Sequence, residues 1–315
     1  MEIIMTIYEI LDDIRSDRVK KCIIDSDMYN EMDDQYALAH ALGSGKIEVL
    51  SVNAEPFYNG RCVDFETGMV ESVKESRRIL EICGRGDVPV FEGSRVKFSP
   101  DNGYAPIDTP AARNIVDTAT TSDELIYILA TGCCSNVTSA ILLEPAIKEK
   151  ICVIWLGGHE LDFKDCHEFN LSQDWAAGQI LMNSGVPLVM LPAGANEGSR
   201  GGTCQLWANI DTFKAIKGDG RVQRFFAEEF PNEFVPKDRP YRVGDWDGPV
   251  RVIYDIAAPG VLSVPSAFGF EVIPAPIFCD NKLYAFDSTR HKIIYVNEIK
   301  RDAVYADMFK AIEAL

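Results

Sequence analysis

Apolar residues in this chain occur in two kinds of stretch: short continuous runs, and longer segments in which they recur with helical spacing. The continuous runs lie at residues 22–24, 47–52, 88–91, 125–130, 151–156 and 188–191. Short apolar runs bounded by Gly, Pro, Asn or Asp favour buried β-strands. Because helical patterns separate most of these runs, the sequence predicts an α/β fold. Its sheet should be open and mostly parallel, with helices on both faces.

Helical spacing recurs between the predicted strands. It is found at residues 2–15, 35–42, 68–84 and 110–121, and in a closing segment from about residue 302. Residues 268–300 favour C-terminal antiparallel strands instead, including one at 292–296.

Two proline-containing segments interrupt the alternation of predicted strands and helices. Residues 96–112 predict a long surface loop, and residues 231–250, with prolines among charged residues, predict an insertion or lid. We find no internal repeat and no interdomain linker. The sequence therefore predicts one domain over residues 1–315, with residues 1–19 as an N-terminal extension.

Composition narrows the class of protein. An apolar content of 47% is enough for a substantial core, and the net charge of -17 argues against nucleic acid or an anionic membrane as a partner. The nine cysteines have irregular spacing without a zinc-finger pattern, which is typical of reduced thiols. The sequence also lacks a secretory signal and an apolar run of membrane-spanning length. We therefore expect a cytoplasmic protein.

The densest group of acidic residues follows the first predicted strand. Five carboxylates lie within ten residues, at Asp25, Asp27, Glu31, Asp33 and Asp34. The carboxyl end of a strand is where open α/β sheets place their ligand sites, and a hard divalent cation such as Ca²⁺ or Mg²⁺ would offset the repulsion. An alternative is that Asp33 and Asp34 only favour a helix N-terminus. That alternative does not account for Asp25 and Asp27.

Other predicted strand ends also carry polar groups. Thr131 follows one apolar run, and Asp255 closes the apolar segment 250–255. Since the carboxyl ends of parallel strands converge, Asp27, Asp34 and Asp255 with a backbone carbonyl would form an oxygen cage for Ca²⁺. Alone, Asp255 is equally compatible with a helix N-cap.

Four motifs in this order resemble those of the inosine-uridine-preferring nucleoside hydrolase family. They are D-x-D followed by D-D at residues 25–34, T-G-C-C-S-N at 131–136, G-G at 157–158 with E-F-N-x-x-x-D at 168–174, and the pair Tyr254-Asp255. The first motif fits a bacterial branch with the longer form D-x-D-x-Y-N-E-x-D-D-Q. The resemblance covers roughly residues 20 to 310 and implies the nucleoside hydrolase fold.

The resemblance implies hydrolysis of a ribonucleoside, or a related N-riboside, to ribose and free base. Its Ca²⁺ ligands would be Asp27, Asp34, the Thr131 carbonyl and Asp255. Asp27 would also take a proton from the attacking water, and Asp25 would support the ligands. The ribose hydroxyls would be bound by Asp33, Glu168 and Asn170. Family members commonly form homo-oligomers, so a homodimer or homotetramer is expected.

The sequence departs from the family pattern at the leaving-group acid. Tyr254 stands where the family has a His, and a phenol with a pKa near 10 is a poor general acid at neutral pH. Tyr254 would stack on the base, donate a hydrogen bond or simply pack. His159 and His167 are alternative acids, or surface residues.

Further departures concern the expected substrate pocket. The family's Gly-Asn pair after the second strand is missing here, and Asn59 is either its substitute or only a turn residue. We expect the inserted Asn30 and Glu31 to reach the part of the pocket that binds the base or the 5′ side of the ribose. The candidates in the 231–250 segment are Trp246 and Tyr241 as lid aromatics, and Arg239 and Arg242 for a phosphate.

Two other functions remain compatible with the sequence. Asp25-Ser26-Asp27 after a strand resembles the nucleophile motif of haloacid dehalogenase phosphatases, although the downstream residues of that chemistry cannot be placed. A ribose- or nucleoside-binding protein with little catalysis would explain the replacement of His by Tyr254.

Overall fold

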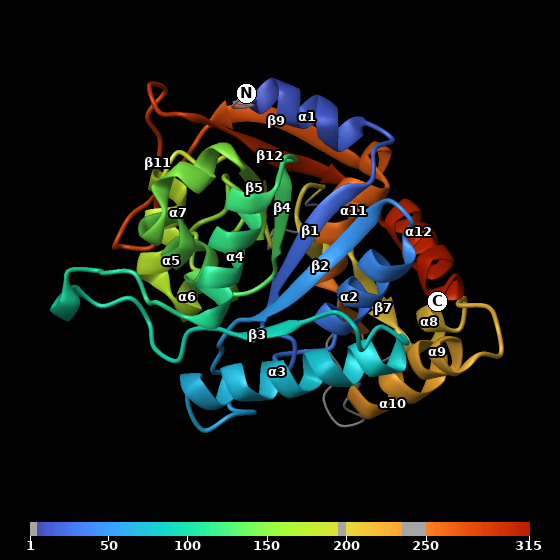
Figure 1. Ribbon diagram of the computed structural model, residues 1–315. Coiled ribbons are helices and arrows are strands. Elements are labelled where there is room, and N and C mark those ends of the chain that lie inside the picture. The colour runs from blue at the N-terminus through green and yellow to red at the C-terminus, as the bar shows by residue number, and fades with distance from the viewer. Residues whose placement is uncertain (1–4, 195–199, 235–249) are drawn as a thin grey trace.

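The structure is a computed structural model that describes residues 5–194, 200–234 and 250–315. An eight-stranded sheet runs through its centre in the order β3-β2-β1-β4-β5-β6-β12-β9 (Figure 1). In that order the strands are β3 (Val90–Glu92), β2 (Ile47–Ala54), β1 (Lys20–Ser26), β4 (Ile126–Ala130), β5 (Ile151–Leu156), β6 (Leu188–Leu191), β12 (Lys292–Ile299) and β9 (Phe268–Pro274). All neighbours are parallel except β12 and β9, so the predicted mostly parallel sheet is confirmed.

Helices cover both faces of the sheet. They are α1 (Ile7–Arg15), α2 (Asp33–Gly43), α3 (Phe65–Ile82), α4 (Pro110–Thr121), α5 (Ser135–Leu143), α6 (Phe169–Gln173), α7 (Trp175–Asn183), α8 (Ile210–Phe213), α9 (Arg221–Arg224), α10 (Phe230–Phe234), α11 (Ala257–Ser263) and α12 (Arg301–Glu313). Helices α4, α5 and α7 lie on one face, and α2, α11 and α12 lie on the other (Figure 1). Each face has its own apolar core, as a buried central sheet requires. None of the helices in the described ranges has both the length and the apolar character needed to cross a membrane.

The register of the parallel strands places three loops at one edge of the sheet. Asp25 on β1 pairs with Asn53 on β2 and with Ala130 on β4. The residues that directly follow these strands therefore leave the sheet side by side. They include Asp27 and Thr131, as the sequence predicts.

Helix α2 carries the second half of the acidic segment, and buried polar contacts hold it against its neighbours. Asp307 on α12 accepts a hydrogen bond from Ser263 Oγ on α11 (2.5 Å) and contacts His40 Nε2 on α2 (2.8 Å). His40 is fully buried, so this contact fixes α2 from the side away from the site.

Several boundaries match their predictions because local signals define them. Thr109 caps α4 through a hydrogen bond from Ala112 N, and Pro110 occupies its first turn, so the helix begins where the sequence predicts. The predicted loop before it contains only one turn of 3-10 helix, η1 (Pro100–Asn102). The strands of the central sheet come from both ends of the chain, and α1 lies within the predicted N-terminal extension. The single domain over residues 1–315 stays a prediction.

The structure corrects the prediction for the segment that ends at Asp255. The strand β8 (Val250–Val252) pairs antiparallel with β7 (Trp207–Asn209) in a separate two-stranded sheet. Ile253 N donates to the carbonyl oxygen of Leu206, and the chain then turns into the 3-10 helix η5 (Tyr254–Ile256). Asp255 is therefore brought to the site by the start of a helix and not by a strand of the parallel sheet.

The C-terminal tail contains antiparallel strands, as predicted, but is joined to the main sheet. β12 pairs antiparallel with β9 and parallel with β6, while β10 (Ile277–Phe278) and β11 (Tyr284–Ala285) form a small antiparallel pair.

Candidate active site

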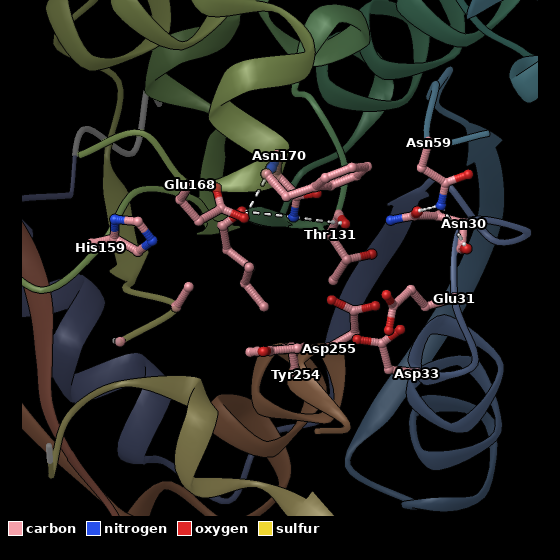
Figure 2. A pocket seen from close by; sticks show the side chains of 14 residues that line it. Asn30, Glu31, Asp33, Asn59, Thr131, His159, Glu168, Asn170, Tyr254 and Asp255 are labelled. Atoms are coloured by element: carbon pink, nitrogen blue, oxygen red, sulfur yellow. Dashed lines mark hydrogen bonds between the residues drawn. The ribbon is translucent and has the colours of Figure 1, made fainter. Parts of the chain in front are cut away.

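A cavity of about 460 Å³ opens at the carboxyl edge of the sheet (Figure 2). Its wall contains most of the residues that the sequence predicts for the site. These are Asp33, Asn59, Thr131, Glu168, Asn170, Tyr254 and Asp255. Asn30, Glu31, Leu156, His159, Phe169, Ala193 and Gly194 complete the wall. Residues separated by more than 200 positions in the sequence therefore share one cavity.

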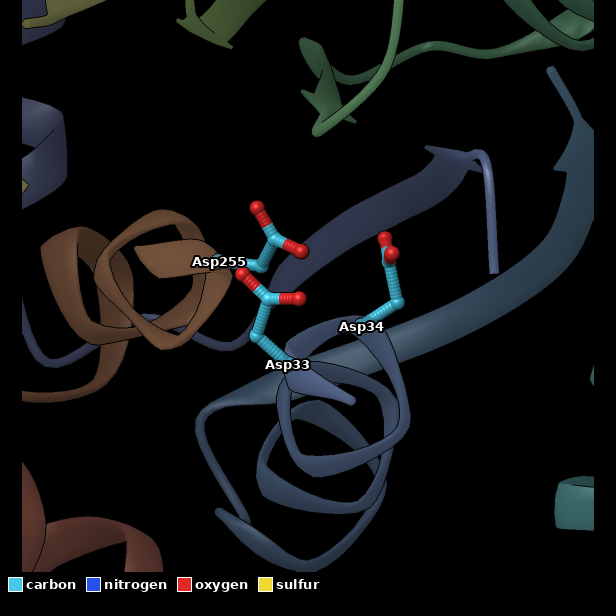
Figure 3. Close-up of side chains that lie close together, drawn as sticks. All are labelled: Asp33, Asp34 and Asp255. Carbon is cyan, nitrogen blue, oxygen red and sulfur yellow. The ribbon is translucent and has the colours of Figure 1, made fainter. Parts of the chain in front are cut away.

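Three carboxyl groups gather where α2 and η5 meet (Figure 3). Asp33, Asp34 and Asp255 each place an oxygen atom within 4.8 Å of the others, and all three side chains are buried. Asp33 and Asp34 occupy the first turn of α2, where the helix dipole favours negative charge. Their burial against a third carboxyl group means that the dipole alone does not explain them. The cluster includes Asp33, to which the family resemblance assigns a role in binding ribose.

Hydrogen bonds leave several of the buried carboxyl oxygens without a donor. Asp34 Oδ1 accepts from Ser26 Oγ (2.5 Å) and Thr131 Oγ1 (2.8 Å), which fixes the carboxyl group. Asp34 Oδ2 and both oxygens of Asp27 have no hydrogen-bond partner in the described structure. Buried carboxylate oxygens without donors are costly, so this arrangement fits a cation with oxygen ligands.

Burial and mutual repulsion have the same effect on these acids. Burial raises the pKa of Asp27 well above its ordinary value, and the carboxyl groups of Asp34 and Asp33 raise it further. The pKa of Asp255 is raised by burial and then by Asp33 and Asp34. A bound cation would reverse this effect by favouring the ionised forms.

Glu168 and Asn170 form the opposite wall of the cavity. Glu168 caps the short helix α6 and accepts backbone N–H groups from Asn170 (2.8 Å), Leu171 (3.1 Å) and Gly158 (3.1 Å). Burial nevertheless raises the pKa of Glu168 to about 7. Asn170 Nδ2 donates to the carbonyl oxygens of Thr131 and Leu156, each at 3.1 Å. Asn170 thus fixes the carbonyl group that the sequence assigns to the cation, and the second lone pair of that oxygen can still bind a ligand.

Glu55 is a buried acidic residue for which the sequence predicted no role. Its carboxyl group accepts from Asn136 N (2.9 Å) and Cys133 Sγ (3.1 Å) and is fully buried. Burial raises its pKa well above the ordinary value, and the neighbouring Asp25 adds to the shift. Asp25 accepts from Asn136 Nδ2 at 3.0 Å. Glu55 directly follows β2, so the strand-end signal that identified Asp27 applies to it as well.

The insert in the acidic loop contacts the loop that follows β2. Asn59 Nδ2 donates to the carbonyl oxygen of Asn30 (3.0 Å) and to Asn30 Oδ1 (2.6 Å). Arg61 Nη1 donates to the same carbonyl (3.3 Å), and its guanidinium lies 4.2 Å from the centre of the Tyr29 ring. These contacts place Asn30 and Glu31 in the cavity wall (Figure 2).

The alternative acids occupy different places. His159 lies in the cavity wall with Nδ1 facing Asp165 O (3.1 Å) and Asp165 Oδ1 (3.2 Å), and Tyr254 also contributes to the wall. His167 is exposed and packs near Trp175, with ring centres 6.3 Å apart. Trp246, Tyr241, Arg239 and Arg242 lie outside the described residues, as does most of the predicted lid at 231–250.

The fold and site define an α/β protein with an acidic cavity at the carboxyl edge of its sheet that could bind a metal ion. A family model described as inosine-uridine preferring nucleoside hydrolase matches residues 22–296. The chain belongs to this family, so the resemblance stated from the motifs is confirmed. The family is not that of the haloacid dehalogenases.

Individual relatives and solved structures agree with this placement. The pyrimidine-specific ribonucleoside hydrolase RihB of Escherichia coli is 38% identical over 87 residues, which are 27% of this chain and 28% of that protein. The chain spans less than half of the length of the curated relatives that it matches.

Two solved structures cover almost the whole chain. A plant nucleoside hydrolase matches 94% of this chain and 100% of its own, with a TM-score of 0.71 and 19% identity. A purine-preferring ribonucleoside hydrolase from Gardnerella vaginalis matches 93% and 98%, with a TM-score of 0.68 and 18% identity. At these identities the likeness establishes the fold, and the predicted fold class is confirmed.

Proposed function

We propose that this protein hydrolyses the N-glycosidic bond of ribonucleosides or related N-ribosides. The observation that carries the proposal is the set of buried carboxyl groups at the base of the cavity, several of whose oxygens lack hydrogen-bond donors. Membership of the nucleoside hydrolase family supports it. The cavity of about 460 Å³ falls within the range of small-molecule sites.

The donor set fits a hard divalent cation, and we propose Ca²⁺. Asp27, Asp34, Asp255 and the Thr131 carbonyl would hold it, with Asp33 adjacent to the same cluster. Oxygen ligands without nitrogen or sulfur favour Ca²⁺ or Mg²⁺ over transition metals, and the flexible coordination of Ca²⁺ tolerates an irregular cage. When bound, such an ion lowers the pKa of a water molecule.

The chain's own residues would supply the remaining steps. Asp27 would accept a proton from the attacking water, while Asp33, Glu168 and Asn170 would bind the ribose hydroxyls. Cleavage of a C–N ribosidic bond builds positive charge on the ribose ring, as in glycoside hydrolysis. The acidic wall would stabilise that charge, because preorganised groups of opposite sign act strongly in a site that excludes water.

The leaving base presents a separate requirement. Tyr254, His159 and Glu168, whose pKa burial raises to about 7, are side chains of the described cavity wall that could donate a proton. Tyr254 replaces the His of the family pattern. This replacement favours a second candidate function, a nucleoside-binding protein with little turnover. Such a protein would bind ribonucleosides in the presence of Ca²⁺ and release no ribose.

A panel of purine and pyrimidine ribonucleosides, assayed with Ca²⁺ for release of reducing sugar, tests the proposal. Asp27→Asn should lower kcat by about 10³-fold or more, since it removes both the base and a cation ligand. The control is Asp12→Asn, which removes an exposed carboxylate of α1. Full activity of Asp27→Asn after exhaustive chelation would refute the mechanism.

We also propose a cytoplasmic location and a homodimer or homotetramer. All nine cysteines are free thiols, which supports a reducing compartment. The oligomeric state rests on the family resemblance and is measurable by analytical ultracentrifugation.

A further inference from the structure

The charge of the cavity wall is strongly one-sided. Glu31, Asp33, Glu168 and Asp255 contribute carboxyl groups to it, and no Lys or Arg lies among the residues of the described wall. Asp27 and Asp34 add two more carboxyl groups beneath the surface. A divalent cation offsets only two negative charges, so the loaded cavity still favours a cationic ligand and disfavours an anionic one.

The wall is equally one-sided in its proton donors. Tyr254 has a phenol, and a phenol is a weak acid at neutral pH. His159 is held through Nδ1 by Asp165, and its backbone carbonyl accepts from Tyr284 Oη at 2.5 Å. In Figure 2 the ring of His159 lies farther than Glu168 from the carboxyl groups of Asp33 and Asp255. Burial raises the pKa of Glu168 to about 7, but its oxygens accept backbone N–H groups and the proposed function assigns it to the ribose hydroxyls. A neutral base that must be protonated as it leaves therefore has no strong acid of its own in the described wall.

We propose, on the basis of the hydrolase function proposed above, that the preferred substrates are N-ribosides whose base ring carries a positive charge. Pyridinium ribosides and N7-alkylated purine ribosides belong to this class. The acidic wall attracts the cationic ring of these ribosides. Their base can leave without taking a proton from an acid.

The reaction of such a substrate balances without a further reactant. The bond between C1′ and the ring nitrogen breaks, and its electron pair stays on the nitrogen, so the base leaves as a neutral molecule. Water forms a new bond to C1′, and its released proton passes to Asp27 and then to solvent. The products are ribose, the neutral base and one proton.

Glu31 is the residue that would contribute to the preference for a cationic base. It belongs to the insert, and the hydrogen bonds from Asn59 and Arg61 to Asn30 place the insert against the cavity. The guanidinium of Arg61 lies over Tyr29 and is not part of the cavity wall. The carboxylate of Glu31 is therefore presented to the ligand without a described cation beside it in the wall.

The test compares two ribosides with the same leaving nitrogen, nicotinamide riboside and nicotinic acid riboside. Both carry a pyridinium ring, but the second adds a carboxylate. The acidic wall should favour the amide in kcat/KM by about tenfold, the effect of one unit charge acting near a protein surface. Glu31→Gln should reduce this preference several-fold. Glu48→Gln, at the opposite end of β2 and exposed, should not change it.

Uridine and inosine complete the panel and separate the two proposals. Nicotinamide riboside should exceed both in kcat/KM, with a rate that does not fall as pH rises above 8. Equal rates for the amide and the carboxylate, or an unchanged ratio in Glu31→Gln, would overturn the cationic preference. Hydrolysis of uridine or inosine would in that case uphold the general function. Absence of hydrolysis for all four ribosides with Ca²⁺ would overturn both proposals.

Discussion

The two sides of the cavity differ in whether their buried polar groups have hydrogen-bond partners within the described chain. On the side of Glu168 and Asn170, both Glu168 oxygens and the Asn170 amide nitrogen have backbone partners. On the side of α2 and η5, both oxygens of Asp27 and one of Asp34 have none. The first side is complete within the chain, whereas the second needs a ligand to complete it.

This difference indicates how the work of the site is divided. A side that is satisfied by backbone groups is preorganised, so it can hold ribose hydroxyls at fixed positions. On a side with repelling carboxyl groups, the repulsion is relieved when a cation or protons bind.

Ca²⁺ should stabilise the folded protein through the α2 side. A ligand at about 1,000 times its Kd adds about 4 kcal/mol to the free energy of unfolding. Because burial and neighbouring carboxyl groups raise the pKa of Asp27 and Asp255, protons compete with the cation, and the stabilisation should increase from pH 5 to pH 8. Thermal unfolding with and without Ca²⁺ at both pH values measures this effect.

Asp255→Asn should remove most of that stabilisation, whereas Asp12→Asn should keep it. Equal stabilisation by Ca²⁺ in Asp255→Asn and in the unsubstituted protein would show that the cation binds elsewhere.

Sequence patterns predict best those site residues that directly follow a strand of the parallel sheet. Asp27 and Thr131 directly follow β1 and β4, so their convergence follows from the parallel order alone. Asp255 reaches the site from η5, through packing of separate helices. A local pattern does not encode such packing, and the prediction of a strand end there was wrong.

A local sequence pattern also does not predict how the carboxyl groups of the site are oriented. The sequence places Asp33 in the first turn of a helix, but its approach to Asp34 and Asp255 depends on where η5 lies. Glu55, in contrast, carried the strand-end signal and could have been found. The family motifs predicted the fold because four of them occur in order, a condition that a single motif does not meet.

The Glu168 side should show its own pH dependence. Burial raises the pKa of Glu168 from 4.5 to about 7, so the folded protein retains a proton that the unfolded chain has lost between these values. Its contribution to stability is therefore full below pH 4.5 and is lost as pH rises to about 7. The loss amounts to about 3.5 kcal/mol over the whole range, since each pKa unit corresponds to about 1.4 kcal/mol. Urea unfolding at pH 5 and pH 8 measures it.

Glu168→Gln should flatten this pH dependence, although the variant is less stable overall because it accepts fewer backbone hydrogen bonds. Asp64, which caps α3, is the matched control. It is exposed, and hydrogen bonds from Thr67 lower its pKa below the ordinary value, so it is ionised in both the folded and the unfolded chain above pH 5. Asp64→Asn should therefore leave the difference in stability between pH 5 and pH 8 unchanged. If the pH dependence of Glu168→Gln matched that of the unsubstituted protein, Glu168 would not be the group that titrates.

The smallest effect concerns the contact between the insert and the loop after β2. Asn59→Ala removes two exposed hydrogen bonds to Asn30, each worth about 1 kcal/mol or less. The looser insert should raise KM for a riboside substrate by a few-fold and leave kcat nearly unchanged, because the carboxyl group of Asp27, the proposed base, should keep its position. Asn297→Ala, which removes an exposed hydrogen bond on β12, should change neither constant. An Asn59→Ala variant with unaltered KM would mean that Asn59 is only a turn residue, and the insert would then hold its place without this contact.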